Sequence, residues 1–172
     1  MDHFVLNQYL ILIVGVLALA THRNLNLSSL FLVMLLPKAL DFLLLSPFWS
    51  EHRSADFRNW QPFTLALHDM LMIIVIKHRS WIQVLLRRHS AYRKMWQEDA
   101  FCWIFTFAFI WNICMFVEYS LRWYVDRDIT FFHGMNVEVK YLLLILEYVL
   151  LAALTKQSLA AVRSLRKRNL ID

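Results

Sequence analysis

The chain has 172 residues, of which 59% are hydrophobic and 18% charged, with two glycines, three prolines and a formal net charge of +5. Soluble domains carry about 25% charged residues, so this chain is poor in the groups that keep a protein surface in water. This composition excludes a soluble enzyme, a disordered chain and a small membrane anchor that carries a large soluble domain.

Five apolar stretches follow one another along the chain, and none alternates apolar and polar residues as a barrel strand does. Because about 20 apolar residues cross the hydrocarbon core as a helix, they predict an all-α, polytopic membrane bundle of about five transmembrane helices in one domain. The third stretch is the shortest and holds His68 and Asp69, so a four-span bundle is the competing topology. The expected spans are residues 4–20, 28–45, 62–76, 100–121 and 139–161.

Lysine and arginine are unevenly distributed among the segments that join these stretches. Twelve lie in the first connection, the third connection and the C-terminal end, which five spans place on one side of the membrane. Only five lie in the segments on the other side, interleaved with acidic residues. Short loops rich in lysine and arginine face the cytoplasm, so we expect the N-terminus outside and the C-terminus inside. The expected location is the inner membrane of a bacterium.

Two basic segments form the expected cytoplasmic face, residues 78–99 and the tail 162–172. The first places apolar side chains near helical spacing, as in an amphipathic helix on a membrane surface. Attraction to anionic lipid and docking of a soluble cytoplasmic partner both fit these charges, whereas direct nucleic-acid binding is not expected in so short a segment. The residues assigned to this docking are Arg79, Arg87, Arg88, Arg93, Lys94, Arg163, Arg166, Lys167 and Arg168.

Polar residues inside the expected spans are the main functional signal. A charge at the membrane centre costs roughly 2.5–3.5 kcal/mol, so such groups normally face the bundle interior and pair. Lys38 and Asp41 lie three residues apart and can pair on one helix face. Most of the set lies at similar depth on four spans, with Glu118 nearer the outer surface. The set is Lys38, Asp41, His68, Asp69, Asn112, Glu118 and Glu147.

Two interpretations of this set compete. In the first, the groups hydrogen-bond between helices and fix their register, within the chain or with partner subunits. In the second, Asp41, Asp69 and Glu147 line a path for protons or cations. Pro37 lies directly before Lys38 and removes a backbone hydrogen bond, so it can bend the second span at this point.

Catalytic motifs and cofactor sites are not found in the sequence. Haem between helices needs two histidines at similar depth, and only His68 lies at mid-depth. There is no His-Glu-x-x-His motif for zinc, and two glycines cannot form a Gly-x-Ser-x-Gly elbow. Cys102 and Cys114 lie on one span, too far apart for a disulfide with each other. We therefore expect no enzyme activity, no metal and no cofactor.

The sequence predicts a non-enzymatic inner-membrane subunit of an oligomeric or multi-protein complex. Its expected partners are the lipid bilayer, further copies or other membrane subunits, and a soluble cytoplasmic protein. The alternative is a small proton or cation channel, or a transporter subunit, that uses the mid-membrane acids. A third hypothesis is a membrane component of a defence, immunity or lysis-control system, which no individual residue supports.

Overall fold

A computed structural model describes residues 3–21, 25–40, 42–43, 55–81, 94–125 and 130–168 of the chain. In this part of the chain helices are the only regular secondary structure, which confirms the all-α class. The helices are α1 (His3–Ala20), α2 (Leu25–Leu40), α4 (Ala55–Lys77), α6 (Trp96–Val125) and α7 (Phe131–Arg168). Each of the five apolar stretches lies mainly on one of these helices.

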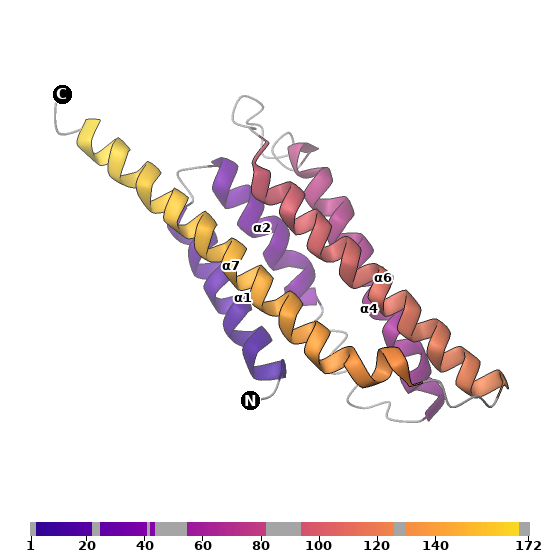
Figure 1. Ribbon diagram of the computed structural model, residues 1–172. Helices are drawn as coiled ribbons and strands as arrows, with labels where there is room; N and C mark the ends of the chain where they lie inside the picture. The colour runs from indigo at the N-terminus through magenta and orange to yellow at the C-terminus, as the bar shows by residue number, and fades with distance from the viewer. Residues whose placement is uncertain are drawn as a thin grey trace.

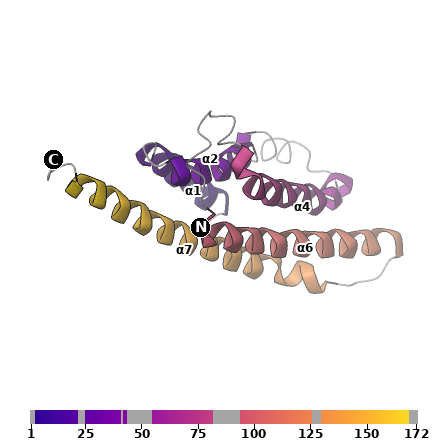
Figure 2. The same ribbon diagram turned by 90° about the horizontal axis from the view of Figure 1, so that it is seen from above.

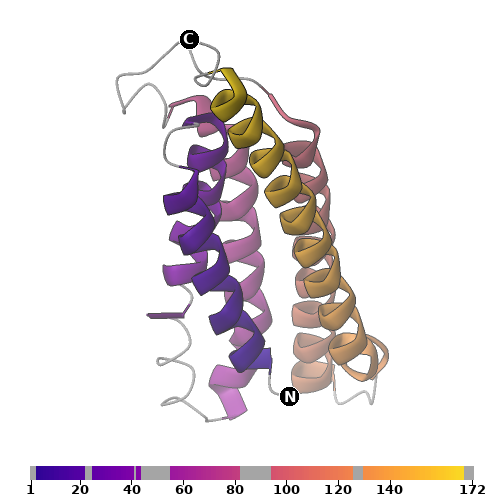
Figure 3. The same ribbon diagram turned by 90° about the vertical axis from the view of Figure 1, so that its left-hand side faces the viewer.

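The helices pack in two layers and alternate in direction along the chain (Figure 1). Each helix contacts the next, from α1 against α2 to α6 against α7. Figure 2 shows α1, α2 and α4 side by side in one layer, with α6 and α7 in the other. Figure 3 shows the same separation from the side, with the two chain ends at opposite ends of the bundle. Residues far apart in sequence therefore meet across the boundary between the layers.

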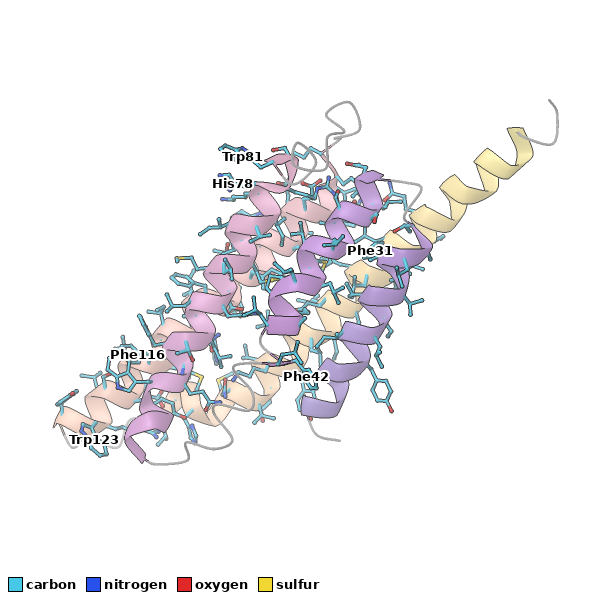
Figure 4. The ribbon with its side chains drawn as sticks, turned by 180° about the vertical axis from the view of Figure 1, so that it is seen from behind. Phe31, Phe42, His78, Trp81, Phe116 and Trp123 are labelled. Carbon is cyan, nitrogen blue, oxygen red and sulfur yellow. The ribbon has the colours of Figure 1, made fainter. Side chains whose placement is uncertain are left out.

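The core is almost wholly aliphatic and aromatic. Its side chains come from all five helices, and they exclude water because each helix turns part of its apolar surface toward its neighbours. Phe31 on α2 is one of the largest side chains with no exposed surface, and it is labelled in Figure 4. The cluster contains Val14, Leu27, Leu30, Phe31, Val33, Met34, Met72, Ile76, Phe101, Phe105, Leu151 and Leu154.

The helix α2 changes its geometry just after Pro37. Its α-helical part ends at Leu40, and Phe42–Leu43 have π-helical geometry. Proline lacks the backbone N–H that would continue the hydrogen-bond ladder, and π turns often occur where that ladder is interrupted. The α-helical part of α2 ends about halfway along α4 (Figure 1), and Lys38 lies on its last turn.

The prediction of a five-span polytopic membrane bundle was wrong. Among the described residues, one helix segment, Trp96–Tyr124 on α6, is long and apolar enough to cross a membrane. The apolar parts of α1 and α2, Ile11–Ala20 and Asn26–Leu40, are too short. The helices α4 and α7 are longer, but ionisable residues interrupt their apolar stretches. The predicted orientation, with the N-terminus outside and the C-terminus inside, depended on five spans and is therefore not supported either.

Some predicted residues lie outside the described part of the chain. They are Asp41 and the segment 82–93, which includes Arg87, Arg88 and Arg93. The expected basic tail begins as the end of α7, which continues to Arg168. The side chains of Arg163, Arg166, Lys167 and Arg168 are also outside the described set.

Truncating a buried side chain of α2 should lower the free energy of unfolding more than truncating an exposed one. Phe31 is 0% exposed, whereas the adjacent Leu32 is 44% exposed. We expect Phe31→Ala to lower the free energy of unfolding by about 3–5 kcal/mol, and Leu32→Ala to change it by about 0.5 kcal/mol. Denaturant unfolding in mild detergent, followed by circular dichroism, measures both. Equal losses would mean that α2 does not present Phe31 to the core.

Candidate functional site

Buried polar side chains connect four helices in the middle of the bundle. Lys38 lies on the last turn of α2, and Glu147 lies midway along α7. His68 and Asp69 lie on α4, and Asn112 lies on α6. Contacts between neighbouring members run from α7 through α2 and α4 to α6. We call the following six residues the polar chain: Pro37, Lys38, His68, Asp69, Asn112 and Glu147.

An ion pair joins the two helical layers at one end of the polar chain. Lys38 Nζ lies 2.7 Å from Glu147 Oε2, and both side chains are buried. The oxygen accepts no hydrogen bond with good angles from a described residue, so the attraction is that of two opposite charges. Lys38 Nζ also lies 5.9 Å from the centroid of the Phe105 ring, within the range of a cation–π contact. The ammonium group is therefore held by α7 and α6 together.

The rest of the polar chain is made by His68, Asp69 and Asn112. Asn112 Nδ2 donates a hydrogen bond to Asp69 Oδ2 at 2.8 Å. His68 Nε2 lies 3.2 Å from the carbonyl oxygen of Pro37, to which its N–H can donate. His68 Nδ1 is 3.8 Å from Asp69 Oδ1, too long for a hydrogen bond but close enough for charge attraction if the ring is protonated. Asn112 Oδ1 accepts no hydrogen bond from a described residue.

Glu118 is buried but belongs to a different group of contacts. Its Oε2 accepts a hydrogen bond from Phe132 N at 2.6 Å, and its Oε1 accepts one from His133 N at 3.1 Å. Arg122 Nη2 donates to the same Oε1 at 3.1 Å. The first N–H groups of a helix lack partners within it, and the N-terminus favours negative charge. Glu118 of α6 therefore caps the N-terminus of α7.

Arg79 lies in the interior, whereas the sequence predicted it at the docking surface. It is 0% exposed, and its guanidinium donates to Asn26 O at 2.6 Å and to Asn26 Oδ1 at 3.0 Å. It also donates to Glu98 Oε1 at 2.7 Å. We call Asn26, Arg79 and Glu98 the end clamp, because it joins the N-terminal part of α2, the segment after α4 and the first turn of α6.

Sequence reasoning missed Asn26 and Glu98 as partners of Arg79. One signal was available: Glu98 lies three residues after Met95, and its carboxylate accepts the Met95 N–H at 2.7 Å, as in half of a capping box. That signal marks the start of α6 but does not identify an arginine on another helix. Nearby, Gln97 Nε2 donates to Gln157 Oε1 at 2.8 Å, which joins α6 to α7.

Lys94 is the one docking residue with a described, exposed side chain. It pairs with Asp99 at 2.9 Å on the surface, where both side chains are more than half exposed. An exposed pair of this kind contributes about 0–1 kcal/mol. Both side chains of the pair face the surface of the molecule.

The described residues offer little for metal or redox chemistry. No group of three or more histidine, cysteine, aspartate or glutamate side chains among them could hold a metal ion. Cys102 and Cys114 are both free thiols. What the polar chain supplies is a paired ammonium and carboxylate, a second carboxylate, an imidazole and an amide, arranged across four helices. Such groups can fix helix register or carry protons and cations.

Comparison of the chain with protein-family models, with curated proteins and with solved structures found no match.

Removing one charge of the Lys38–Glu147 pair should lower the free energy of unfolding more than removing both charges. We expect Lys38→Met or Glu147→Leu alone to lower the free energy of unfolding by about 3–5 kcal/mol, because each leaves a buried charge without its partner. The double variant should lose less than either single variant. Lys156→Met, which removes an exposed lysine of α7, is the matched control. Additive losses in denaturant unfolding would show that the two charges do not interact.

Proposed function

We propose that the protein is a non-enzymatic membrane subunit in which α6 crosses the bilayer and the polar chain holds α2, α4 and α7 against it. The observation that carries this proposal is the combination of length, apolar surface and exposure on α6. Its apolar segment has 29 residues, and only 33% of its most apolar window is buried inside the molecule. The core helix of a soluble protein is mostly buried, because water penalises exposed apolar surface. A low-dielectric surrounding fits this helix better.

Aromatic side chains at the two ends of α6 support the same proposal. Trp103 and Trp123 are both exposed and lie twenty residues apart. At 1.5 Å per residue they are separated by about 30 Å along the helix, which is close to the thickness of a hydrocarbon core. Tryptophan is enriched at both membrane–water interfaces. On the antiparallel α4 the exposed Trp60 lies toward the first of its ends, and the exposed Trp81 lies just after the other.

The exposed side of α1 supports membership of a larger complex. On α1, exposed apolar residues recur at helical spacing and form one face without a charged side chain. Exposed patches of this kind mark contacts with lipid or with another protein. Their members are Tyr9, Leu12, Ile13, Val16 and Leu19. A particle that is monomeric and free of partners in mild detergent would contradict this part of the proposal.

A charge placed midway along the exposed side of α6 tests the membrane proposal. Ile110 is exposed and lies near the centre of the apolar segment. We expect Ile110→Arg to reduce the carbonate-resistant membrane fraction, because arginine at the bilayer centre costs roughly 2.5–3.5 kcal/mol. Tyr124→Arg, at the end of the segment, is the control and should remain in the membrane.

Recovery of the wild type in the carbonate-soluble fraction would contradict the membrane proposal. So would an Ile110→Arg protein that fractionates as the wild type does, since an exposed arginine is harmless on a helix in water.

The second candidate function is a proton or cation pathway, and the composition of the polar chain favours it. Lys38 is already paired with Glu147, so the nearest partners of the buried Asp69 are the neutral Asn112 amide and the imidazole of His68. A buried carboxylate without a full countercharge attracts a mobile cation or proton. The polar chain also spans four helices, which is more than register within one pair requires.

Flux into liposomes distinguishes this candidate from a purely structural polar chain. If Asp69 carries the ion, Asp69→Asn should reduce proton or cation flux at least tenfold while the protein still assembles. Glu138→Gln, which removes an exposed acid of α7, should leave the flux unchanged. Vesicles that remain electrically silent at high protein loading would exclude a channel.

A further inference from the structure

We propose that the end of the α4–α6 pair that carries Lys77 and Lys94 binds the headgroups of anionic phospholipids. This inference rests on the proposed membrane function and identifies which end of the molecule faces the negatively charged lipid surface. Figure 4 shows that His78 and Trp81 lie at this end, opposite Phe116 and Trp123.

Three tryptophans frame the proposed surface. Trp81, Trp96 and Trp103 are 74%, 62% and 72% exposed, although indole is among the largest apolar groups in proteins. Trp81 lies just after the end of α4, and Trp96 and Trp103 lie on the first two to three turns of α6; the two helices pack against each other in opposite directions. An indole ring with its N–H favours the boundary between acyl chains and headgroups. This end of the pair therefore fits the interfacial depth of a bilayer.

Lysines lie next to these rings. Lys77 is exposed at the last residue of α4, four residues before Trp81. Lys94 is exposed two residues before Trp96, and its surface pair with Asp99 is weak enough for a phosphate to compete. Long lysine side chains can extend from the edge of the apolar region to the headgroups. Ammonium groups beside interfacial indoles are complementary to lipid phosphates.

The opposite end of the pair is also aromatic, but its described residues contain no lysine. Trp123 and Tyr124 are exposed there, and Arg122 is bound to the buried Glu118. Residues 119–125 and 130–137, which the structure describes at that end, contain no lysine. Arg58 near the start of α4 lies at that end too, with Asp56 two residues before it. Among the described residues of the pair, both lysines, Lys77 and Lys94, lie at the Trp81 end, which is the end that complements an anionic surface.

The end clamp holds this surface in place. Arg79 lies between Lys77 and Trp81 in sequence, but its guanidinium is buried against Asn26 and Glu98. The clamp joins the segment after α4 to the start of α6, so Lys77 at the end of α4 and Lys94 just before α6 are held near each other. The sequence assigned a lipid contact to Arg79; in the structure Lys77, two residues earlier, is the exposed residue that can make it.

The test uses protein reconstituted in mixed vesicles of phosphatidylcholine and phosphatidylglycerol, with one or the other lipid brominated. Bromine quenches nearby tryptophan fluorescence, so the ratio of the two quenching efficiencies reports local lipid enrichment. A variant in which Trp49, Trp60, Trp111 and Trp123 are replaced by phenylalanine restricts the signal to Trp81, Trp96 and Trp103. Native mass spectrometry of the wild type, which counts bound lipids of each class, gives the same answer if that variant does not fold.

We expect brominated phosphatidylglycerol to quench more strongly than brominated phosphatidylcholine. Lys77→Gln with Lys94→Gln should remove the preference, with a loss of about fivefold for each lysine, the equivalent of about 1 kcal/mol. Lys140→Gln removes the same charge from another part of the molecule and should preserve the preference.

Equal quenching by the two brominated lipids would overturn the headgroup inference and leave the membrane proposal intact. Absence of quenching by either lipid would overturn both. A preference that survives loss of both lysines would also contradict the assignment to this surface.

Discussion

A lysine and a glutamate buried together in an apolar bundle impose the main constraint on this structure. Each charge alone would cost several kcal/mol to remove from water, so neither is tolerated there unless the other lies within contact distance. Lys38 and Glu147 are far apart in sequence and lie in different layers, and their Nζ–Oε2 distance of 2.7 Å fixes α2 against α7. The apolar contacts around them supply attraction without direction, whereas the ion pair specifies which turns of the two helices face each other.

Polar contacts at both ends of the bundle complement the pair in the middle. At one end Arg79 ties α2 and α6 to the segment after α4, and at the other Glu118 caps α7 from α6. In each case a charged side chain satisfies backbone or amide groups that the apolar core leaves without partners. Three levels of directional contacts thus hold helices whose outer surfaces are largely apolar. That combination supports the membrane function that we propose.

Sequence reasoning recovered the helices and most of the buried polar residues, because both follow from local properties. Sustained apolar stretches without alternation predict helices, and the cost of burying a charge predicts that Asp69 and Glu147 face the interior of the bundle. It could not recover the pairing: Lys38 has an acid three residues away, yet the partner that the structure shows is Glu147 on a distant helix. The five-span count was wrong because the apolar parts of α1 and α2 are too short to cross a membrane, and ionisable residues interrupt those of α4 and α7. Arg79 was predicted at the surface because arginine is normally exposed, but its guanidinium is buried against Asn26 and Glu98.

Magic-angle-spinning NMR in lipid bilayers would test the central ion pair most directly. The dipolar coupling between ¹⁵N-labelled Lys38 Nζ and the ¹³C-labelled carboxyl of Glu147 reports their separation, and the Lys38→Arg protein identifies the signal. The account predicts the strong dephasing of a direct contact, as the 2.7 Å Nζ–Oε2 distance requires. Absence of dephasing in folded protein would contradict the account, because the two helical layers would then be joined by something other than this pair.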